Sequence, residues 1–199
     1  MNLTTRFESV CRELVDKGWT IQDEFLEPEL VLQLAGECIN DYQQGRLKQA
    51  GVGRGDQKLT ELAIRGDQIR WLERGMSNAV DRYLDCIERL RRHFNEQLFS
   101  NLENSESHFA YYGNGAFYQK HLDQFQNSNQ RIISSVLYLN PDWQKHHGGE
   151  LRLHLAGAQV DVAPIANRMV LFMSADIWHE VLPTTAPRLS LTGWFRRRA

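Results

Sequence analysis

Three stretches in the first hundred residues carry apolar side chains at the spacing of an amphipathic helix. The first has one face made of Phe7, Val10, Cys11, Leu14 and Val15. Thr5 and Glu8 match a capping box at its start, and Gly18 is placed to end it. The pattern therefore predicts a helix from about Thr5 to Gly18.

Two longer helices are expected further along the chain. The second is marked by Leu30, Val31, Leu34, Ala35, Cys38, Ile39 and Tyr42, with Pro28 near its start. The third begins near Ser77 and is marked by Val80, Tyr83, Leu84, Ile87, Leu90, Phe94 and Leu98. Such stripes are typical of helices that pack one face against a core. Residues 19–25 are too short and mixed for a helix and are compatible with a strand.

A polar segment that contains several glycines separates the second and third helices. It predicts a long loop from Gly51 to about Ala63, followed by a strand near residues 69–73. The glycines do not match G-x-G-x-x-G and no Lys-Ser/Thr follows, so a phosphate-binding loop is not expected. A polar loop of this length is often functional.

The second half of the chain changes to the period of β-strands. Its short apolar segments are SHFAYY, FYQKHLD, IISSVLYLN, ELRLHL, MVLFMS and LSLTGWF. Turn residues such as Gly113-Asn114-Gly115 and Asn140-Pro141-Asp142 separate them. Evenly spaced short strands indicate a sandwich or barrel, jelly rolls included. Helices followed by strands predict an α+β fold in which the helices cover one sheet.

Composition narrows the class of protein. Hydrophobic residues make up 42% and charged residues 24% of the 199 residues, as in one globular domain. The formal net charge of −2 gives no basic excess, so no nucleic-acid partner is expected. No apolar run approaches the roughly 18 residues of a membrane span, and no secretory signal is evident. Three cysteines, an odd number, favour a reducing cytoplasm over a disulfide framework.

The triplet His121-Leu122-Asp123 is the first candidate for chemistry. On a strand, residues i and i+2 point to the same face, so this imidazole and carboxylate could bind one ion together. His179, in the strand-like residues 177–182, is the best third ligand. Two histidines and one carboxylate are the ligands of non-haem Fe(II) oxygenases, and similar sets bind catalytic zinc. Alone, the triplet is weak, because hydrogen-bonded surface pairs have the same spacing.

Arg188 is the second candidate. If it begins the last strand, Ser190, Thr192 and Trp194 share its face. An arginine directed into an apolar barrel is costly unless it binds an anion, and its planar fork fits a carboxylate. The alternative is a surface arginine at the start of a strand.

Together these residues resemble the 2-oxoglutarate- and Fe(II)-dependent dioxygenase superfamily, and within it the prolyl 4-hydroxylases of the hypoxia-inducible-factor type. The segments that carry the resemblance are IRGDQIRWLE, YYGNGAFYQKHLD, VLYLNPDW, GGELRL and HEVLPTTAPRLSLTGWF. They follow the family's order over about residues 65–196. The resemblance implies a double-stranded β-helix, which is a jelly roll, backed by N-terminal helices.

The resemblance also implies roles for individual residues. His121, Asp123 and His179 would bind Fe(II). Arg188 would form a salt bridge with the distal carboxylate of the cosubstrate 2-oxoglutarate, and Tyr138 would donate a hydrogen bond to the same group.

Further positions follow from the same resemblance. Thr192 would lie beside the distal carboxylate and Tyr111 near the metal end of the cosubstrate. The pocket walls would be Val136, Leu151 and Trp194. The loop before Arg65-Gly66-Asp67 resembles a mobile loop that folds over a prolyl substrate, with Asp67 and Arg131 expected to pair as its anchor.

The expected enzyme is a single dioxygenase domain over residues 1–199. Residues 1–100 would be mainly supporting helices and the substrate loop, and residues 101–199 the catalytic jelly-roll core. The implied reaction uses O2 and 2-oxoglutarate to hydroxylate a prolyl residue in a flexible loop of a protein, and it releases succinate and CO2. Elongation factor Tu is the family precedent for the substrate, and ascorbate is commonly the reductant. The protein is expected to be monomeric and cytoplasmic.

Two other readings stay open. An oxygenase of the same superfamily could act on a small molecule or a free amino acid. A non-catalytic jelly-roll domain could bind a sugar or a partner protein, although such a domain has no need of an open metal face and a carboxylate clamp. Trp178, where the animal enzymes have proline before the distal histidine, and the different loop sequence leave the substrate open.

Overall fold

The computed structural model describes residues 3–51, 64–124 and 130–198. Its three helices are α1 (Leu3–Lys17), α2 (Pro28–Gln43) and α3 (Asn78–Leu98), and a short 3-10 turn, η2, covers Lys145–His147. The predicted loop from Gly51 to Ala63 lies outside the described residues apart from Gly51 itself.

All eleven strands of the described residues belong to two antiparallel sheets. The major sheet has the order β1-β9-β6-β11-β4-β3-β2. Its strands are β1 (Trp19–Gln22), β2 (Lys48–Gln49), β3 (Asp67–Trp71), β4 (Asn104–Tyr112), β6 (Arg131–Tyr138), β9 (Met169–Met173) and β11 (Arg188–Arg196). The minor sheet, in the order β5-β10-β7-β8, consists of β5 (Tyr118–His121), β7 (Leu151–Leu155), β8 (Ala158–Val162) and β10 (Trp178–Val181).

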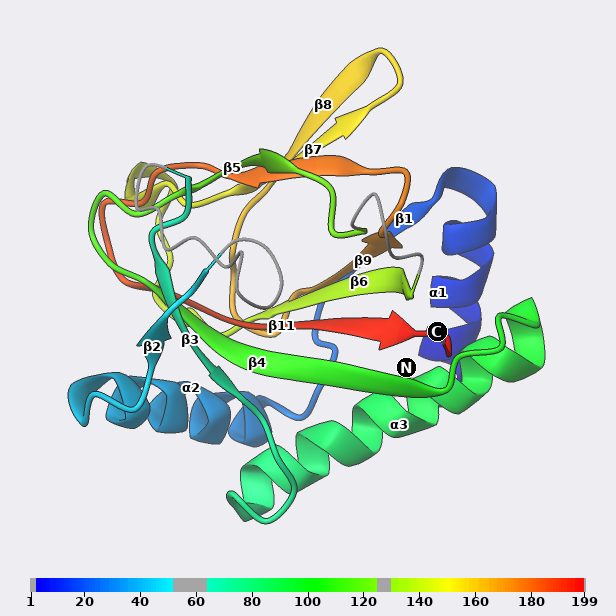
Figure 1. The fold of residues 1–199 in the computed structure, drawn as a ribbon, viewed down its shortest axis with the longest axis horizontal. Helices are drawn as coiled ribbons and strands as arrows, with labels where there is room; N and C mark the ends of the chain where they lie inside the picture. Colours follow the sequence, from blue (N-terminus) through cyan, green and yellow to red (C-terminus); the bar gives the residue numbers. More distant parts are fainter. Residues whose placement is uncertain (1–2, 52–63, 125–129, 199) are drawn as a thin grey trace.

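The helices and the minor sheet lie on opposite faces of the major sheet, as Figure 1 shows. One apolar cluster joins the helices to the sheet through side chains such as Leu137, Leu191 and Phe195. A second cluster lies between the two sheets and includes Val136 and Tyr138. Alternate residues of β6 therefore enter different cores, as the two-residue period of a strand requires. This confirms the predicted α+β jelly roll backed by N-terminal helices.

The helix boundaries agree with the predictions at most ends. The Ser77 side chain accepts a hydrogen bond from the Val80 amide and caps α3, and Pro28 is the first residue of α2. Gly18 follows α1 with φ +79°, a backbone conformation that suits glycine. The expected start of α1 was wrong, because the helix begins at Leu3 and contains Thr5 within its first turn.

Three other local expectations were incomplete or wrong. Val15 is 71% exposed and does not share the buried face of α1. The strand expected near residues 69–73 lies at Asp67–Trp71. The segment Ala158–Val162 forms the edge strand β8, which the apolar pattern did not indicate because most of its side chains are exposed.

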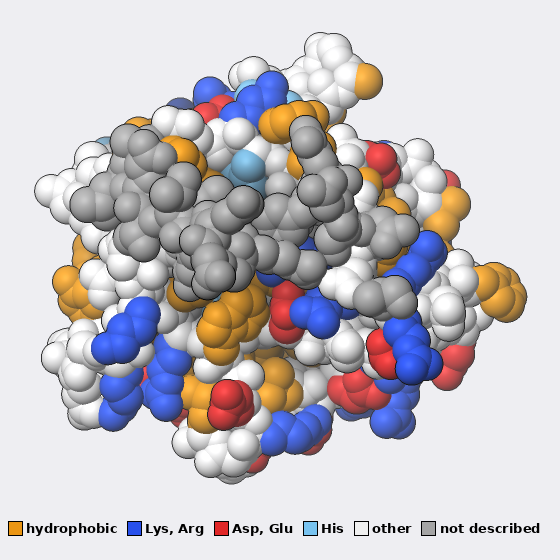
Figure 2. Space-filling model, viewed as in Figure 1, with side chains coloured by type: hydrophobic (Ala, Val, Ile, Leu, Met, Phe, Trp, Pro, Cys, Tyr) orange, Lys and Arg blue, Asp and Glu red, His pale blue; other side chains and the backbone are white. Residues whose placement is uncertain are grey.

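The molecular surface has no concentration of one charge on the face seen in Figure 2, where acidic and basic side chains are interspersed. This distribution agrees with the formal net charge of −2. Among the described residues, no helix combines the length and the apolar character that crossing a bilayer requires. The three cysteines, Cys11, Cys38 and Cys86, are free and buried.

Candidate metal and carboxylate site

The two sheets enclose a cavity of about 330 Å³. It is lined from the minor sheet by His121, His179 and Leu151, and from the major sheet by Val136 and Arg188. Residues from both halves of the jelly roll therefore meet in one place, although they are widely separated along the chain.

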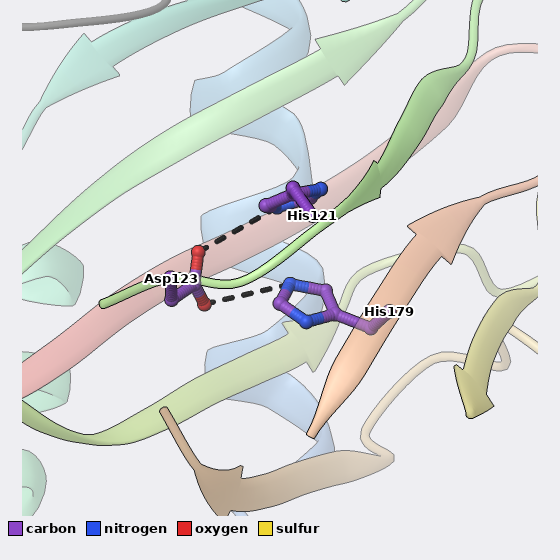
Figure 3. A group of neighbouring side chains, drawn as sticks. All are labelled: His121, Asp123 and His179. Atoms are coloured by element: carbon purple, nitrogen blue, oxygen red, sulfur yellow. Dashed lines mark ion pairs between the residues drawn. The ribbon is translucent and has the colours of Figure 1, made fainter. Parts of the chain in front are cut away.

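His121, Asp123 and His179 form a compact group at this cavity (Figure 3). One ligand atom from each lies within 4.8 Å of the others. His121 and His179 are direct partners in the pairing of β5 with β10. The Nε2 atoms of His121 and His179 lie 3.6 and 3.5 Å from the two carboxylate oxygens of Asp123. The predicted third ligand is thus in place, but Asp123 lies beyond the end of β5 and not on a strand.

Both imidazoles are held in the same way. Nδ1 of His121 lies 2.7 Å from the carbonyl oxygen of Gln119, and Nδ1 of His179 lies 3.0 Å from that of Ile177. A carbonyl oxygen only accepts hydrogen bonds, so each Nδ1 carries the proton and donates it. Each Nε2 then keeps a free lone pair directed at Asp123, which is the arrangement that a metal ligand needs.

The charges of the group also suit a cation. Burial by itself would raise the pKa of Asp123, but His179, His121 and the hydroxyl of Ser134 hold the pKa of this carboxyl well below its usual range. Burial lowers the pKa of His179 to about 4, so its imidazole stays neutral near pH 7. Ionised carboxylates and neutral imidazoles are the ligand forms that a divalent metal binds.

Arg188 begins β11 and points into the same cavity. It is only 2% exposed, and its Nε donates to the Gly149 carbonyl at 2.7 Å. Ser190, two residues along the strand, is 3.3 Å from its Nη1. Within the described part of the chain, no carboxylate forms an ion pair with Arg188. A buried cation without an anion is costly, so the site suits an anionic ligand.

Tyr138 lies next to this cation. The centre of its ring is 5.1 Å from the Arg188 guanidinium carbon. Its hydroxyl is buried and has no hydrogen-bond partner among the described residues. Burial raises the pKa of Tyr138 to about 12, so the hydroxyl keeps its proton and can donate it. A buried hydroxyl without a hydrogen-bond partner, beside a buried guanidinium without an anionic partner, fits the distal carboxylate of 2-oxoglutarate.

Most of the other predicted pocket residues line the cavity. They are Val136, Leu151, Thr192 and Trp194. Thr192 and Trp194 follow Arg188 at two-residue intervals, as the strand period required.

Tyr111 does not line the cavity. It packs on the helix side of the sheet, where its ring stacks on Tyr42 with 3.7 Å between centroids. The next residue, Tyr112, lines the cavity instead and lies 4.8 Å from the Arg188 guanidinium carbon. The expectation for Tyr111 was therefore wrong by one residue, and on a strand one residue reverses the face.

The predicted pairing of Asp67 with Arg131 was also wrong. Asp67 is fully buried and receives two hydrogen bonds from Arg65, at 2.5 and 2.8 Å. Arg131 instead pairs with Glu106 at 2.9 Å and lies over the ring of Trp194, 3.5 Å from its centroid. Both arginines still line the cavity.

Several cavity residues had not been singled out, among them His108, Tyr112 and Tyr118. His108 is 1% exposed and contacts the rings of Trp71 and Trp194. Tyr118 stacks on His121 with 3.6 Å between centroids. His108 and Tyr112 share one face of β4, so the strand period could have paired them once one was placed.

This arrangement can perform oxidative chemistry on a bound metal. Two histidines and one carboxylate on one side of an ion leave its other side free for ligands. The chain also provides a cation and a hydroxyl donor at a distance from the metal group, so a dicarboxylate could bind the metal at one end and Arg188 at the other.

Comparison with known proteins agrees with this chemistry. Residues 107–196 match the family model of the 2OG-Fe(II) oxygenase superfamily, where 2OG stands for 2-oxoglutarate. The mouse prolyl hydroxylase EGLN3 is 32% identical over 197 residues, which cover 92% of this chain and 80% of the mouse protein. The chain belongs to the prolyl hydroxylase family of 2OG-Fe(II) oxygenases. The superfamily predicted from the sequence, its Fe(II) and its 2-oxoglutarate are thereby confirmed.

Solved structures support the same family. A prolyl-4-hydroxylase from Pseudomonas putida superposes with a TM-score of 0.87 at 45% identity, covering 97% of this chain and all of the other. A prolyl hydroxylase from Trichoplax adhaerens, solved with a peptide of the hypoxia-inducible factor oxygen degradation domain, also gives a TM-score of 0.87, at 27% identity. It covers 98% of this chain and 90% of its own.

Proposed function

We propose that this enzyme is a protein prolyl 4-hydroxylase that uses Fe(II), O2 and 2-oxoglutarate and releases succinate and CO2. The observation that carries the proposal is the cavity of about 330 Å³, which the metal group and Arg188 line together, with the buried Tyr138 next to Arg188. The 32% identity to EGLN3 and the 45% identity to the Pseudomonas enzyme support the choice of proline as the target.

His121, Asp123 and His179 would hold the iron. When bound, the iron would activate the oxidant O2 with 2-oxoglutarate as the electron donor, and the protein would supply binding, orientation and exclusion of water. Each histidine would present the Nε2 lone pair that its Nδ1 hydrogen bond leaves free.

Arg188 and Tyr138 would bind the distal carboxylate of 2-oxoglutarate. The Arg188 fork can give parallel hydrogen bonds, and the Tyr138 hydroxyl can add a third. Gly149 allows this position, because a Cβ there would lie 3.0 Å from the Arg188 side chain. Thr192, on the same face of β11, completes the polar surface around the carboxylate.

The substrate would be a protein segment that contains proline. The Trichoplax relative was solved with a peptide fragment of hypoxia-inducible factor, which supports a protein substrate and not a small molecule. On this enzyme, Trp71 and His108 line the cavity and offer an aromatic surface for a proline ring. Elongation factor Tu remains our proposed substrate class by family precedent.

We take residues 1–199 as one dioxygenase domain, active as a monomer in the cytoplasm. Ascorbate would keep the iron reduced between turnovers.

Mass spectrometry on treated extracts tests the function directly. Purified enzyme with Fe(II), 2-oxoglutarate and ascorbate should add one oxygen atom to a prolyl residue of an extract protein. The Asp123→Ala variant is the matched control and should give no such product. Conversion of 2-oxoglutarate that depends on a free amino acid, with no modified protein, would contradict the proposal and favour a small-molecule oxygenase.

A further inference from the structure

The three residues of the metal group do not belong to one rigid element. His121 and His179 are paired partners within the minor sheet. Asp123 follows the end of β5, so no strand pairing fixes it. Its carboxylate instead contacts the major sheet, where the Ser134 hydroxyl of β6 donates to Oδ2 at 2.7 Å.

A second hydroxyl continues this contact. Ser174, just after β9, has its Oγ 2.8 Å from that of Ser134. A serine hydroxyl has one proton to donate, and Ser134 gives it to the carboxylate. The proton between the two serines therefore comes from Ser174, which fixes the direction of the chain from Ser174 through Ser134 to Asp123.

The backbone beside Asp123 is held at the same place. The Gln124 amide donates to the Ser174 carbonyl at 3.3 Å. Ser174 in turn donates its amide to the carbonyl of Ile132, a residue of β6, at 3.0 Å. Ser174 thus supports both the main chain and the side chain of the segment that carries the carboxylate.

With the backbone held, the carboxylate of Asp123 can still rotate about its terminal side-chain torsion. The terminal torsion of an aspartate has broad preferences, so its oxygens are not directed by the backbone alone. Both imidazoles are fixed by their Nδ1 hydrogen bonds, and their Nε2 atoms lie 3.5 Å or more from Asp123, beyond hydrogen-bond length. Within the described part of the chain, Ser134 is the one hydroxyl that donates to this carboxylate.

The side chains of Ser134, Ser174 and Asp123 are all shielded from water. Ser134 is 1% exposed, Ser174 is fully buried and Asp123 is 8% exposed. Water cannot readily replace a hydroxyl that is removed here, so the loss of either serine should be felt at the carboxylate.

We propose that Ser134, supported by Ser174, is a positioning residue that sets the carboxylate of Asp123 for metal binding and so couples the major sheet to the two histidines of the minor sheet. The inference rests on the proposed role of this group as the iron site. Partners of metal ligands typically change metal affinity 10- to 100-fold when they are removed.

Binding of Mn(II), followed by electron paramagnetic resonance without 2-oxoglutarate, tests this without catalysis. Ser134→Ala should raise the Kd for Mn(II) about 10- to 100-fold, and Ser174→Ala should raise it by a smaller factor. Ser134→Thr, which keeps the hydroxyl, should restore binding. Ser135→Ala is the matched control, because Ser135 is the next residue of β6, is 2% exposed and points to the opposite face.

A purely structural role would give a different result. It would lower the melting temperature of the metal-free protein while folded protein bound Mn(II) with the wild-type Kd. A Kd for Ser134→Ala within twofold of the wild type would overturn the inference. If that variant does not fold, Ser134→Cys decides, because it keeps the volume and replaces a strong donor with a weak one. Failure of the wild type itself to bind Mn(II) would instead refute the iron site.

Discussion

Replacing Arg188 by methionine should separate ligand binding from the stability of the free protein. Arg188 is 2% exposed and forms no ion pair within the described residues, so in the absence of ligand its charge is buried without a counter-ion. Methionine has a similar length, no charge and a preference for apolar surroundings. Replacing a buried charge with a well-packed apolar side chain is often neutral or stabilising.

The cost to ligand binding should be large. Removing one partner of a buried hydrogen-bonded charge pair costs roughly 2–5 kcal/mol. At about 1.4 kcal/mol for each tenfold change, the Kd for 2-oxoglutarate should rise between about 30-fold and several thousandfold. Arg188→Lys should recover little of this, because a lysine does not offer the planar fork.

Thermal melting with Mn(II) in place of Fe(II) measures both effects together. At a 2-oxoglutarate concentration of about 100 times its Kd, the wild type should gain about 2.7 kcal/mol. For a chain of this length, that corresponds to a rise of about 5–10 °C in Tm. With a Kd at least 30-fold weaker, Arg188→Met should gain at most about 3 °C at the same concentration.

Arg152→Met removes an arginine that pairs with Asp161 on the β7–β8 hairpin, away from the cavity, and should keep the full gain in Tm. If Arg188→Met gains as much as the wild type, Arg188 does not bind the cosubstrate. The assignment of the distal carboxylate would then be wrong.

Three further variants test other parts of the site. Asp123→Ala should lose Mn(II) binding and 2-oxoglutarate turnover while circular dichroism shows an intact fold, and retained activity would remove it from the ligands. Tyr138→Phe should weaken 2-oxoglutarate binding by about tenfold to a hundredfold without loss of stability, because its hydroxyl is unpaired in the free protein; an unchanged Kd by calorimetry would argue against that hydrogen bond. Burial, followed by the charge of Arg65, lowers the pKa of His108 to about 4, so between pH 6.5 and 4 the unfolded chain binds more protons and stability falls as the pH falls. Between pH 7 and 5, urea titrations should show the wild type losing about 2 kcal/mol more than His108→Gln, with exposed His146→Gln as the control; equal losses in all three proteins would refute the buried neutral imidazole.

The parts of the fold that the sequence could predict are those with a regular period and a buried face. The α3 stripe and its Ser77 cap are examples, since both the spacing and the cap are local properties. The strand β8 was missed because an exposed edge strand has no apolar face to reveal it. The side chain of Val15 shows the opposite error, since an apolar residue beside a helical stripe need not be covered.

In the site, too, some residues could be placed from the local sequence and others only from the packing of the strands. The strand pattern alone left Arg188 as either an interior or a surface arginine, and the resemblance to the dioxygenases favoured the interior, where it is buried. Tyr111 and Tyr112 are adjacent, and only the position of β4 between β11 and β3 decides which one faces the cavity. The partner of Asp67 could not be predicted, because Arg65 and Arg131 both line the cavity and only the packing of the strands shows that Arg65 reaches it.

Asp123 was correctly predicted to join the metal group, but the strand-period argument for it was only partly right. The strand period placed His121 and Asp123 on one face, but the strand ends at His121 and the carboxylate reaches the histidines from the bend that follows. A residue outside a strand needs another support, and in this protein Ser134 and Ser174 of the opposite sheet provide it. No sequence pattern marks either serine, because buried serines in or next to strands are common. Ser134 is 11 residues from Asp123 and 40 residues from Ser174. The metal site is therefore recognised from its ligands but positioned by residues that only the packing of two sheets brings to them.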